Sequence, residues 1–90
     1  MQFDWDEANE LHISRHGITR SEVEEALIDP LGQLVDSNVV DEELRFSHIG
    51  ATFRGRLLIV AFTIRVDATR PITAFDADSY TSRVYRQGAE

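Results

Sequence analysis

Most side chains able to bind a phosphate group or catalyse its chemistry lie in the second half of the chain. Metal-free RNA cleavage needs an acid and a base around the 2′-hydroxyl and the leaving oxygen, and cations that stabilise the phosphorane charge. Arginine, tyrosine and histidine can supply these roles, and arginine can bind phosphate through two parallel hydrogen bonds. Arginines that flank strands are often simply solvated side chains at the strand ends, so a phosphate-binding site built from them stays a hypothesis. Its candidates are Arg56, Arg65, Arg70, Arg83, Arg86, Tyr80, Tyr85 and His48.

The two halves of the chain differ in charge. The sequence has 16 acidic residues against 9 arginines and no lysine, which gives a net charge of −7. Residues 1–43 hold 12 acids and 2 arginines, net −10, whereas residues 44–90 hold 4 acids and 7 arginines, net +3. The acidic total disfavours non-specific binding to nucleic acid. An anionic ligand is expected to meet the second half.

Two other kinds of site could start from the first third of the chain. His12 and His16 have the i, i+4 spacing of metal-binding histidines, but no glutamate follows the first histidine as in a zincin. Packing and helix-ending roles are therefore favoured over a metal. Two helices meeting near Gly17 could form a helix-turn-helix, but the second would expose an acidic face that repels phosphates. We expect neither a metal site nor direct DNA binding.

Gly17 marks the expected junction of these helices, because glycine readily ends a helix in the left-handed conformation. Thr19 and Glu22 then form a capping box for a second helix, from about Arg20 to Ile28. Its buried positions have the i, i+3, i+4 spacing. They are Val23, Ala26 and Leu27.

The first helix is expected to follow a short edge strand at Gln2–Trp5 and to run to about His16. Asp4 or Asp6 can accept the first backbone N–H groups of this helix. Its buried stripe is predicted to contain Ala8, Leu11 and His12.

The rest of the chain alternates as strands do. Residues Arg56–Arg65 are apolar on both faces, which is typical of a central strand. The other expected strands are Gln33–Asp36, Leu44–Gly50 and Arg70–Phe75. A turn is expected at Ser37-Asn38, a solvated acidic loop at Asp41-Glu42-Glu43 and a hairpin at Ala51–Gly55. The last helix is expected to be capped by Asp76 or Asp78 and to run to about Arg86. The order β-α-α-β-β-β-β-α predicts one α+β domain over residues 1–90, an antiparallel sheet of four to five strands with its helices on one side.

Composition limits the cellular setting. The sequence contains no cysteine, so neither a disulfide framework nor a thiolate metal site is expected. No signal peptide is visible, and the longest apolar run, Leu57–Ile64, is too short to cross a bilayer. A cytoplasmic location is the default expectation.

Several short blocks along nearly the whole chain keep an order and spacing found together in one family. They are Phe3-x-Trp5-Asp6, Asn9-x-x-His12-Ile13-x-Arg15-His16-Gly17-Ile18-Thr19-x-x-Glu22-Val23-x-Glu25, Asp29-Pro30, Arg45-Phe46 with Gly50, Gly55-Arg56-x-Leu58, Thr63-x-Arg65, Arg70-Pro71-Ile72-Thr73-Ala74, and Arg83 with Tyr85. Together they resemble the BrnT-type toxin family.

This resemblance implies a RelE-like fold and the ribonuclease half of a type II toxin–antitoxin pair. The implied enzyme cleaves RNA without metal or cofactor. It is neutralised by a BrnA-like antitoxin that carries the DNA-binding function. The implied assembly is a homodimer of the toxin or a heterotetramer with the antitoxin. The candidate catalytic residues are Arg65, Arg83, Tyr85 and His16, and the candidate RNA-binding residues are Arg56, Arg70, Arg86 and His48.

The chain departs from the family after its last strand. Phe75 stands where the family tends to have a basic residue, and residues 78–82 carry none of the expected positive charge. Loss of phosphate-facing arginines lowers the stabilisation of transition-state charge. The alternative is therefore a protein-binding module of the same fold with weakened or absent catalysis.

Overall fold

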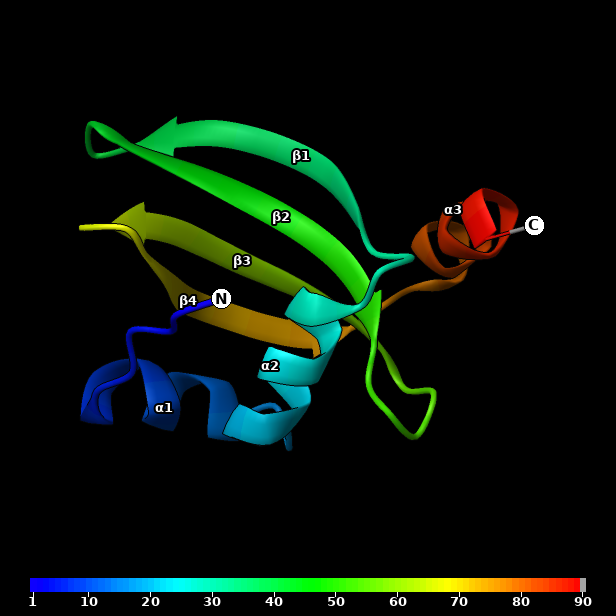
Figure 1. Cartoon of the computed structure of the whole chain (residues 1–90), viewed down its shortest axis with the longest axis horizontal. Coiled ribbons are helices and arrows are strands. Elements are labelled where there is room, and N and C mark those ends of the chain that lie inside the picture. Colours follow the sequence, from blue (N-terminus) through cyan, green and yellow to red (C-terminus); the bar gives the residue numbers. More distant parts are fainter. Residues whose placement is uncertain (90) are drawn as a thin grey trace.

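Four antiparallel strands form one sheet with two helices against one face and a third helix at one end (Figure 1). The computed structural model describes residues 1–89. The strands pair in chain order, β1-β2-β3-β4. The elements are α1 (Glu7–Ser14), α2 (Arg20–Ile28), β1 (Gln33–Val40), β2 (Glu43–Ala51), β3 (Leu57–Arg65), β4 (Ala68–Asp76) and α3 (Ser79–Ala89). The predicted α+β class and antiparallel sheet are confirmed.

The junction between α1 and α2 is built as predicted. Gly17 has a φ of +68°, in the left-handed region. The Thr19 hydroxyl accepts from the Glu22 backbone N–H, and the Glu22 carboxylate accepts from the Thr19 N–H. The buried residues of α2 are Val23, Ala26 and Leu27, also as predicted.

Helix α1 buries a different stripe from the predicted one. Its buried residues are Asn9 and Ile13, whereas Leu11 is 54% exposed. The Asn9 side-chain amide donates 3.0 Å hydrogen bonds to the carbonyl oxygens of Asp4 and Pro71, which turns this face toward β4. A polar residue therefore anchors the helix, which a search for apolar spacing could not detect. The helix begins after Asp6, one of the two expected caps.

Two strand predictions need correction. The expected strand at Gln2–Trp5 is reduced to one parallel bridge between Phe3 and Thr69, because α1 begins immediately afterwards. The predicted turn at Ser37-Asn38 is wrong, since both residues continue the β1–β2 ladder. The chain turns instead at Asp41-Glu42, where both φ angles are positive.

The core lies between the sheet and the two N-terminal helices. Leu58 and Val60 of β3 are completely buried and pack with Ala74 of β4. Strand β3 pairs with both β2 and β4, so its predicted central place is confirmed. The helical contribution to this cluster is Ile13, Ile18, Val23, Ala26 and Leu27.

Helix α3 does not share the face covered by α1 and α2. It lies at the end of the sheet (Figure 1), where the Gln33 Nε2 is 3.5 Å from the Val84 carbonyl oxygen. Asp78 accepts the Thr81 backbone N–H at 2.7 Å, so Asp78 rather than Asp76 holds the start of this helix. Asp76 has another partner, described below. Within residues 1–89 no helix has the length and apolar character needed to span a membrane.

The turn between β3 and β4 places a valine in an unfavourable conformation. Val66 has a φ of +50° and is 98% exposed. Left-handed backbone costs an L-residue about 1–2 kcal/mol, and most for β-branched side chains. We expect Val66→Asn to raise the free energy of unfolding by about 1 kcal/mol, because asparagine tolerates this region. Denaturant unfolding measures the change, and Val39→Asn on β1 is the control, which should give no stabilisation.

Candidate active site

Three arginines converge on a pocket beside α1. The pocket has a volume of about 220 Å³. The starts of β2 and β4 and the end of β3 meet at one end of an antiparallel sheet, which brings residues distant in sequence together. The lining residues are Ala8, Asn9, His12, Glu43, Arg45, Arg65, Arg70, Pro71 and Ile72.

Glu43 lies between two of these arginines. Its Oε2 accepts from the Nε and Nη2 of Arg65 at 3.1 and 2.9 Å, and its Oε1 is 3.5 Å from the Nε of Arg45. The Arg65 hydrogen bonds hold the pKa of the Glu43 carboxyl below its usual range, with added attraction from both arginine charges. Glu43 is therefore an ionised carboxylate at neutral pH.

Arg45 contains a buried donor without a well-aligned hydrogen bond. Its Nε is shielded from solvent and makes no well-aligned hydrogen bond among the described residues, although the Glu43 Oε1 lies 3.5 Å away as an ion-pair partner. Buried polar atoms are nearly always satisfied, so an exception calls for an explanation. Arg45 therefore lines the pocket with part of its hydrogen-bonding capacity unused.

Arg70 is fixed beside the pocket by the start of α1. Its Nη2 is 2.9 Å from the Asp6 Oδ2, its Nη1 is 3.5 Å from the Asp4 Oδ2, and its side chain is only 14% exposed. Asp6 also accepts the Asn9 backbone N–H, and this bond, followed by the contact with Arg70, lowers the pKa of the Asp6 carboxyl. The helix cap thus orients a pocket arginine.

The pocket contains His12 but not His16. The two rings are neighbours on α1, with centroids 6.2 Å apart and planes at 45°. Imidazole is a group that can exchange protons near neutral pH. Histidine, carboxylate and guanidinium groups therefore line one pocket. Within residues 1–89 no three metal-binding side chains are grouped as a metal site.

A second polar cluster joins α3 to the end of α2. Asp29 Oδ2 accepts from the Tyr85 hydroxyl at 2.7 Å and from the Ala51 N–H at 2.8 Å. Burial raises the pKa of the Asp29 carboxyl, but these hydrogen bonds outweigh it and leave the pKa lowered. The hydrogen bond to Asp29, together with burial, raises the pKa of Tyr85 to about 12. Tyr85 is thus a donor at neutral pH, and its position explains how α3 is held.

The Tyr85–Asp29 bond should make stability depend on alkaline pH. The folded pKa of Tyr85, about 12, exceeds its ordinary value of 10.0, so the bond contributes fully below pH 10 and is lost as pH rises toward 12. We expect Tyr85→Phe to lower the free energy of unfolding by about 1–2 kcal/mol at pH 7 and to flatten this alkaline decline. Unfolding across pH 7–12 tests this. Tyr80→Phe, at a 72% exposed tyrosine, should leave both quantities unchanged.

His48 belongs to the same region and is partly buried. Its Nε2–H donates to the Ala26 carbonyl oxygen at 3.0 Å. Burial lowers the pKa of His48, against the opposing effects of the Ala26 bond and the Asp29 charge. The ring is therefore neutral at pH 7 and ties β2 to α2.

Arg56 joins three separate segments. Its Nη1 donates to the Gly17 carbonyl and the Glu22 Oε2, both at 3.1 Å, and its Nε and Nη2 donate to Asp76 at 2.7 and 3.1 Å. The paired hydrogen bond with Asp76 is the main cause of its raised pKa. This cation is thus already committed to contacts within the fold.

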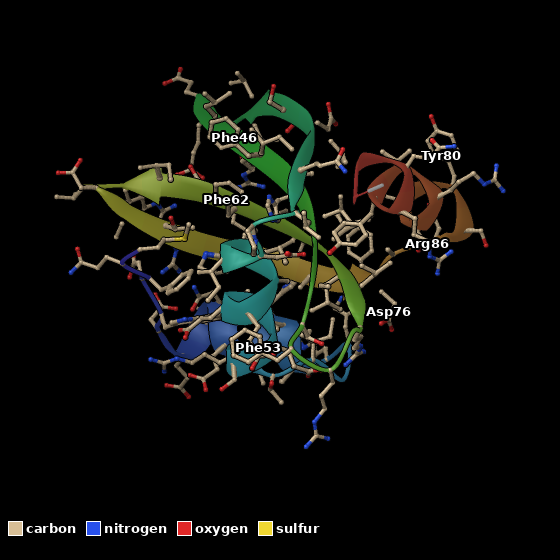
Figure 2. All side chains as sticks on the ribbon, turned by 45° about the vertical axis from the view of Figure 1, so that its right-hand side comes forward. Phe46, Phe53, Phe62, Asp76, Tyr80 and Arg86 are labelled. Carbon is tan, nitrogen blue, oxygen red and sulfur yellow. The ribbon has the colours of Figure 1, made fainter. Side chains whose placement is uncertain are left out.

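The structure divides the predicted site residues among several places. Arg65 and Arg70 share the pocket, Tyr85 and His48 surround Asp29, and Arg83 and Arg86 are exposed on α3, where Figure 2 shows Arg86. Three pocket-lining residues were not predicted as site residues. The sequence analysis placed Glu43 in a solvated loop, assigned His12 to packing, and used Arg45 only as part of the Arg45-Phe46 block.

One family model matches residues 5–80, a range that contains every residue lining the pocket. Its description is ribonuclease toxin, BrnT, of type II toxin–antitoxin system. A search of curated proteins found no match.

Proposed function

The chain belongs to the BrnT family of ribonuclease toxins of type II toxin–antitoxin systems, and on this premise we propose that it cleaves RNA in the pocket beside α1 without a metal ion. The observation that carries the proposal is the convergence of Arg45, Arg65 and Arg70 on one pocket that Glu43 and His12 also line. A phosphate group in this pocket would meet guanidinium groups from three strands, with a carboxylate and an imidazole beside them.

In this proposal the pocket residues divide the chemistry among themselves. The Glu43 carboxylate takes the proton of the 2′-hydroxyl, the 2′-oxygen attacks phosphorus, and the bond from phosphorus to the 5′-oxygen breaks. His12 donates a proton to the leaving 5′-oxygen. The arginines stabilise the added negative charge. The products are a 2′,3′-cyclic phosphate and a 5′-hydroxyl.

These roles differ from the sequence-based assignments. Arg65 keeps its catalytic role, and Arg70 keeps its phosphate-binding role. In place of His16 and Tyr85, the proposal gives the proton-transfer roles to His12 and Glu43. Arg83, Arg86 and His48 lie outside the pocket lining, so we assign them no part in bond breaking.

The loss of family-typical basic residues after β4 is weaker evidence against catalytic activity than the sequence suggested. Phe75 and residues 78–82 are not among the pocket-lining residues. Missing positive charge there removes no cation from the pocket. The binding-module alternative therefore loses one of its two motivations, and the other, the net charge of −7, remains.

The family implies an antitoxin protein as partner. We propose that this antitoxin is BrnA-like, that it carries the DNA-binding function, and that it acts in the cytoplasm with the toxin. A neighbouring gene for a short basic protein would support this assignment.

Induction of the chain alone in bacteria tests the function. We expect growth to stop and messenger RNA to be cut, with growth restored when the neighbouring antitoxin gene is also expressed. Unaffected growth with intact RNA, at a verified level of folded protein, would favour the binding module instead.

A further inference from the structure

A second pocket adjoins the pocket beside α1, and we call it the N-terminal pocket. It has a volume of about 460 Å³ and is lined by Gln2, Phe3, Asp4, Arg65, Val66 and Ala68. Arg65 lines both pockets. The other lining residues have no role in the proposed bond breaking. A group bound in the N-terminal pocket would therefore lie next to a phosphate held by Arg65.

Backbone hydrogen bonds fix one wall of the N-terminal pocket. The Thr69 N–H donates to the Gln2 carbonyl oxygen at 2.8 Å, and the Asp4 N–H donates to the Thr69 carbonyl oxygen at 2.9 Å. These bonds hold the segment against β4 through the bridge at Phe3, and Figure 1 shows the N-terminus beside β4. The Asn9 side chain also donates to the Asp4 carbonyl oxygen. This wall is therefore in place before a ligand binds.

The lining of the N-terminal pocket suits a nucleobase better than a second phosphate. Val66, Ala68 and the partly buried Phe3 supply an apolar surface. Aromatic side chains are common stacking partners of bases in single-stranded RNA. The Asp4 carboxylate would repel a phosphate, but it can accept hydrogen bonds from a base. Gln2 adds a side-chain amide that can both donate and accept.

The Asp4 carboxylate can discriminate among the four RNA bases, because it offers two acceptor oxygens and no donor. Guanine alone presents two neighbouring donor groups, N1–H and the N2 amino group, on its Watson–Crick edge. Adenine and cytosine each present one amino group beside an acceptor, and uracil presents one N–H between two acceptors. The carboxylate is available for such a contact. It makes no hydrogen bond within residues 1–89, and its ion pair with the Arg70 Nη1 is 3.5 Å long.

From these features we infer that the N-terminal pocket binds a guanine base next to the cleaved phosphate and that Asp4 selects this base. The position of the phosphate rests on the RNA cleavage proposed above, but base binding itself needs no cleavage. The Asp4 carboxylate accepts from N1–H and the N2 amino group, and the Gln2 amide donates to O6. Gln2 and Asp4 precede the residues that the family model matches, so family membership does not predict this selectivity.

Titration of the chain with guanosine, adenosine, cytidine and uridine 3′-monophosphates tests base binding without cleavage. In two-dimensional NMR spectra we expect the backbone amide signals of Phe3, Val66 and Ala68 to shift. The guanosine nucleotide should bind about tenfold more tightly than the others, as expected for one paired contact to a base edge. Equal affinities for the four nucleotides, or shifts that leave out these three amides, would overturn the inference.

Two matched variants assign the selectivity to one carboxylate. Asp4→Asn should reduce the affinity for the guanosine nucleotide to that for the other three, because the amide replaces one acceptor oxygen with a donor. The control is Asp67→Asn, which removes the same charge from an exposed turn residue that does not line the pocket. It should keep the full preference. Preference retained in Asp4→Asn, or lost equally in both variants when both are folded by circular dichroism, would contradict the assignment to Asp4.

Mapping of the cut sites in a random-sequence RNA separates this inference from the proposed function. We expect guanine to be enriched beside the cleaved bond with the wild type and with Asp67→Asn. With Asp4→Asn this enrichment should be lost while cleavage next to other bases persists, since Asp6 still holds Arg70 at 2.9 Å. Cleavage by the wild type without base preference would overturn the inference and leave the proposed function intact. Guanosine-selective binding without cleavage would support the N-terminal pocket and contradict the proposed function.

Discussion

Replacing Arg45 with alanine is expected to lower the rate of RNA cleavage by a factor of about 100 to 1,000, the usual effect of losing one preorganised donor to transition-state charge. Arg45 is chosen because it lines the pocket together with Arg65 and Arg70. A phosphate bound there would lose one of the three positive charges around it. Single-turnover cleavage of a short RNA measures the effect.

The control for this variant is Arg54→Ala. Arg54 is exposed at the β2–β3 turn, outside the pocket lining. Its replacement by alanine removes the same unit of charge as Arg45→Ala. Cleavage should stay within about twofold of the wild type. An equal loss in both variants would mean that net charge, rather than the pocket, governs the rate. Circular dichroism checks that each variant is folded.

Replacing Arg56 with alanine is expected to lower stability rather than chemistry. The change removes hydrogen bonds to Asp76, Glu22 and the Gly17 carbonyl. Hydrogen bonds to charged groups contribute about 1.5–3 kcal/mol each when buried. The Arg56 side chain is 31% exposed, so hydrogen bonds from water offset part of the free energy lost with these bonds. We expect a loss of about 2 kcal/mol and a fall in Tm of roughly 10 °C.

The activity of Arg56→Ala separates a structural role from RNA binding. Measured well below its Tm, cleavage per folded molecule should match that of Arg54→Ala. Arg56→Lys should recover little stability, because lysine cannot make the paired bond to Asp76. Unchanged stability with strongly weakened RNA binding would instead support the sequence-based assignment of Arg56 to RNA.

The parts of the fold that were predictable are those determined by local chemistry. Gly17, Thr19 and Glu22 specify a helix junction within a few residues of each other, and the apolar run in β3 indicates a central strand. The failures came from distant partners. Asn9 turned α1 by bonding to Pro71, and the ladder with β2 carried β1 through two residues that usually favour a turn.

The site was harder to predict than the fold for the same reason. Arginine composition pointed to the second half of the chain, and Arg65 and Arg70 indeed share the pocket. Glu43 looked like part of a solvated acidic loop because its partner, Arg65, is far away in sequence. Nothing local distinguishes Arg56, committed within the fold, from Arg45, whose buried Nε makes no well-aligned hydrogen bond within the described residues.

The most direct test of the proposed chemistry is the structure of the RNA ends made by the purified chain in excess EDTA. The proposal requires cleavage under these conditions, with 2′,3′-cyclic phosphate and 5′-hydroxyl ends, and strong loss of this reaction in Glu43→Gln. Cleavage that needs an added metal ion, or that leaves 5′-phosphate ends, would contradict it.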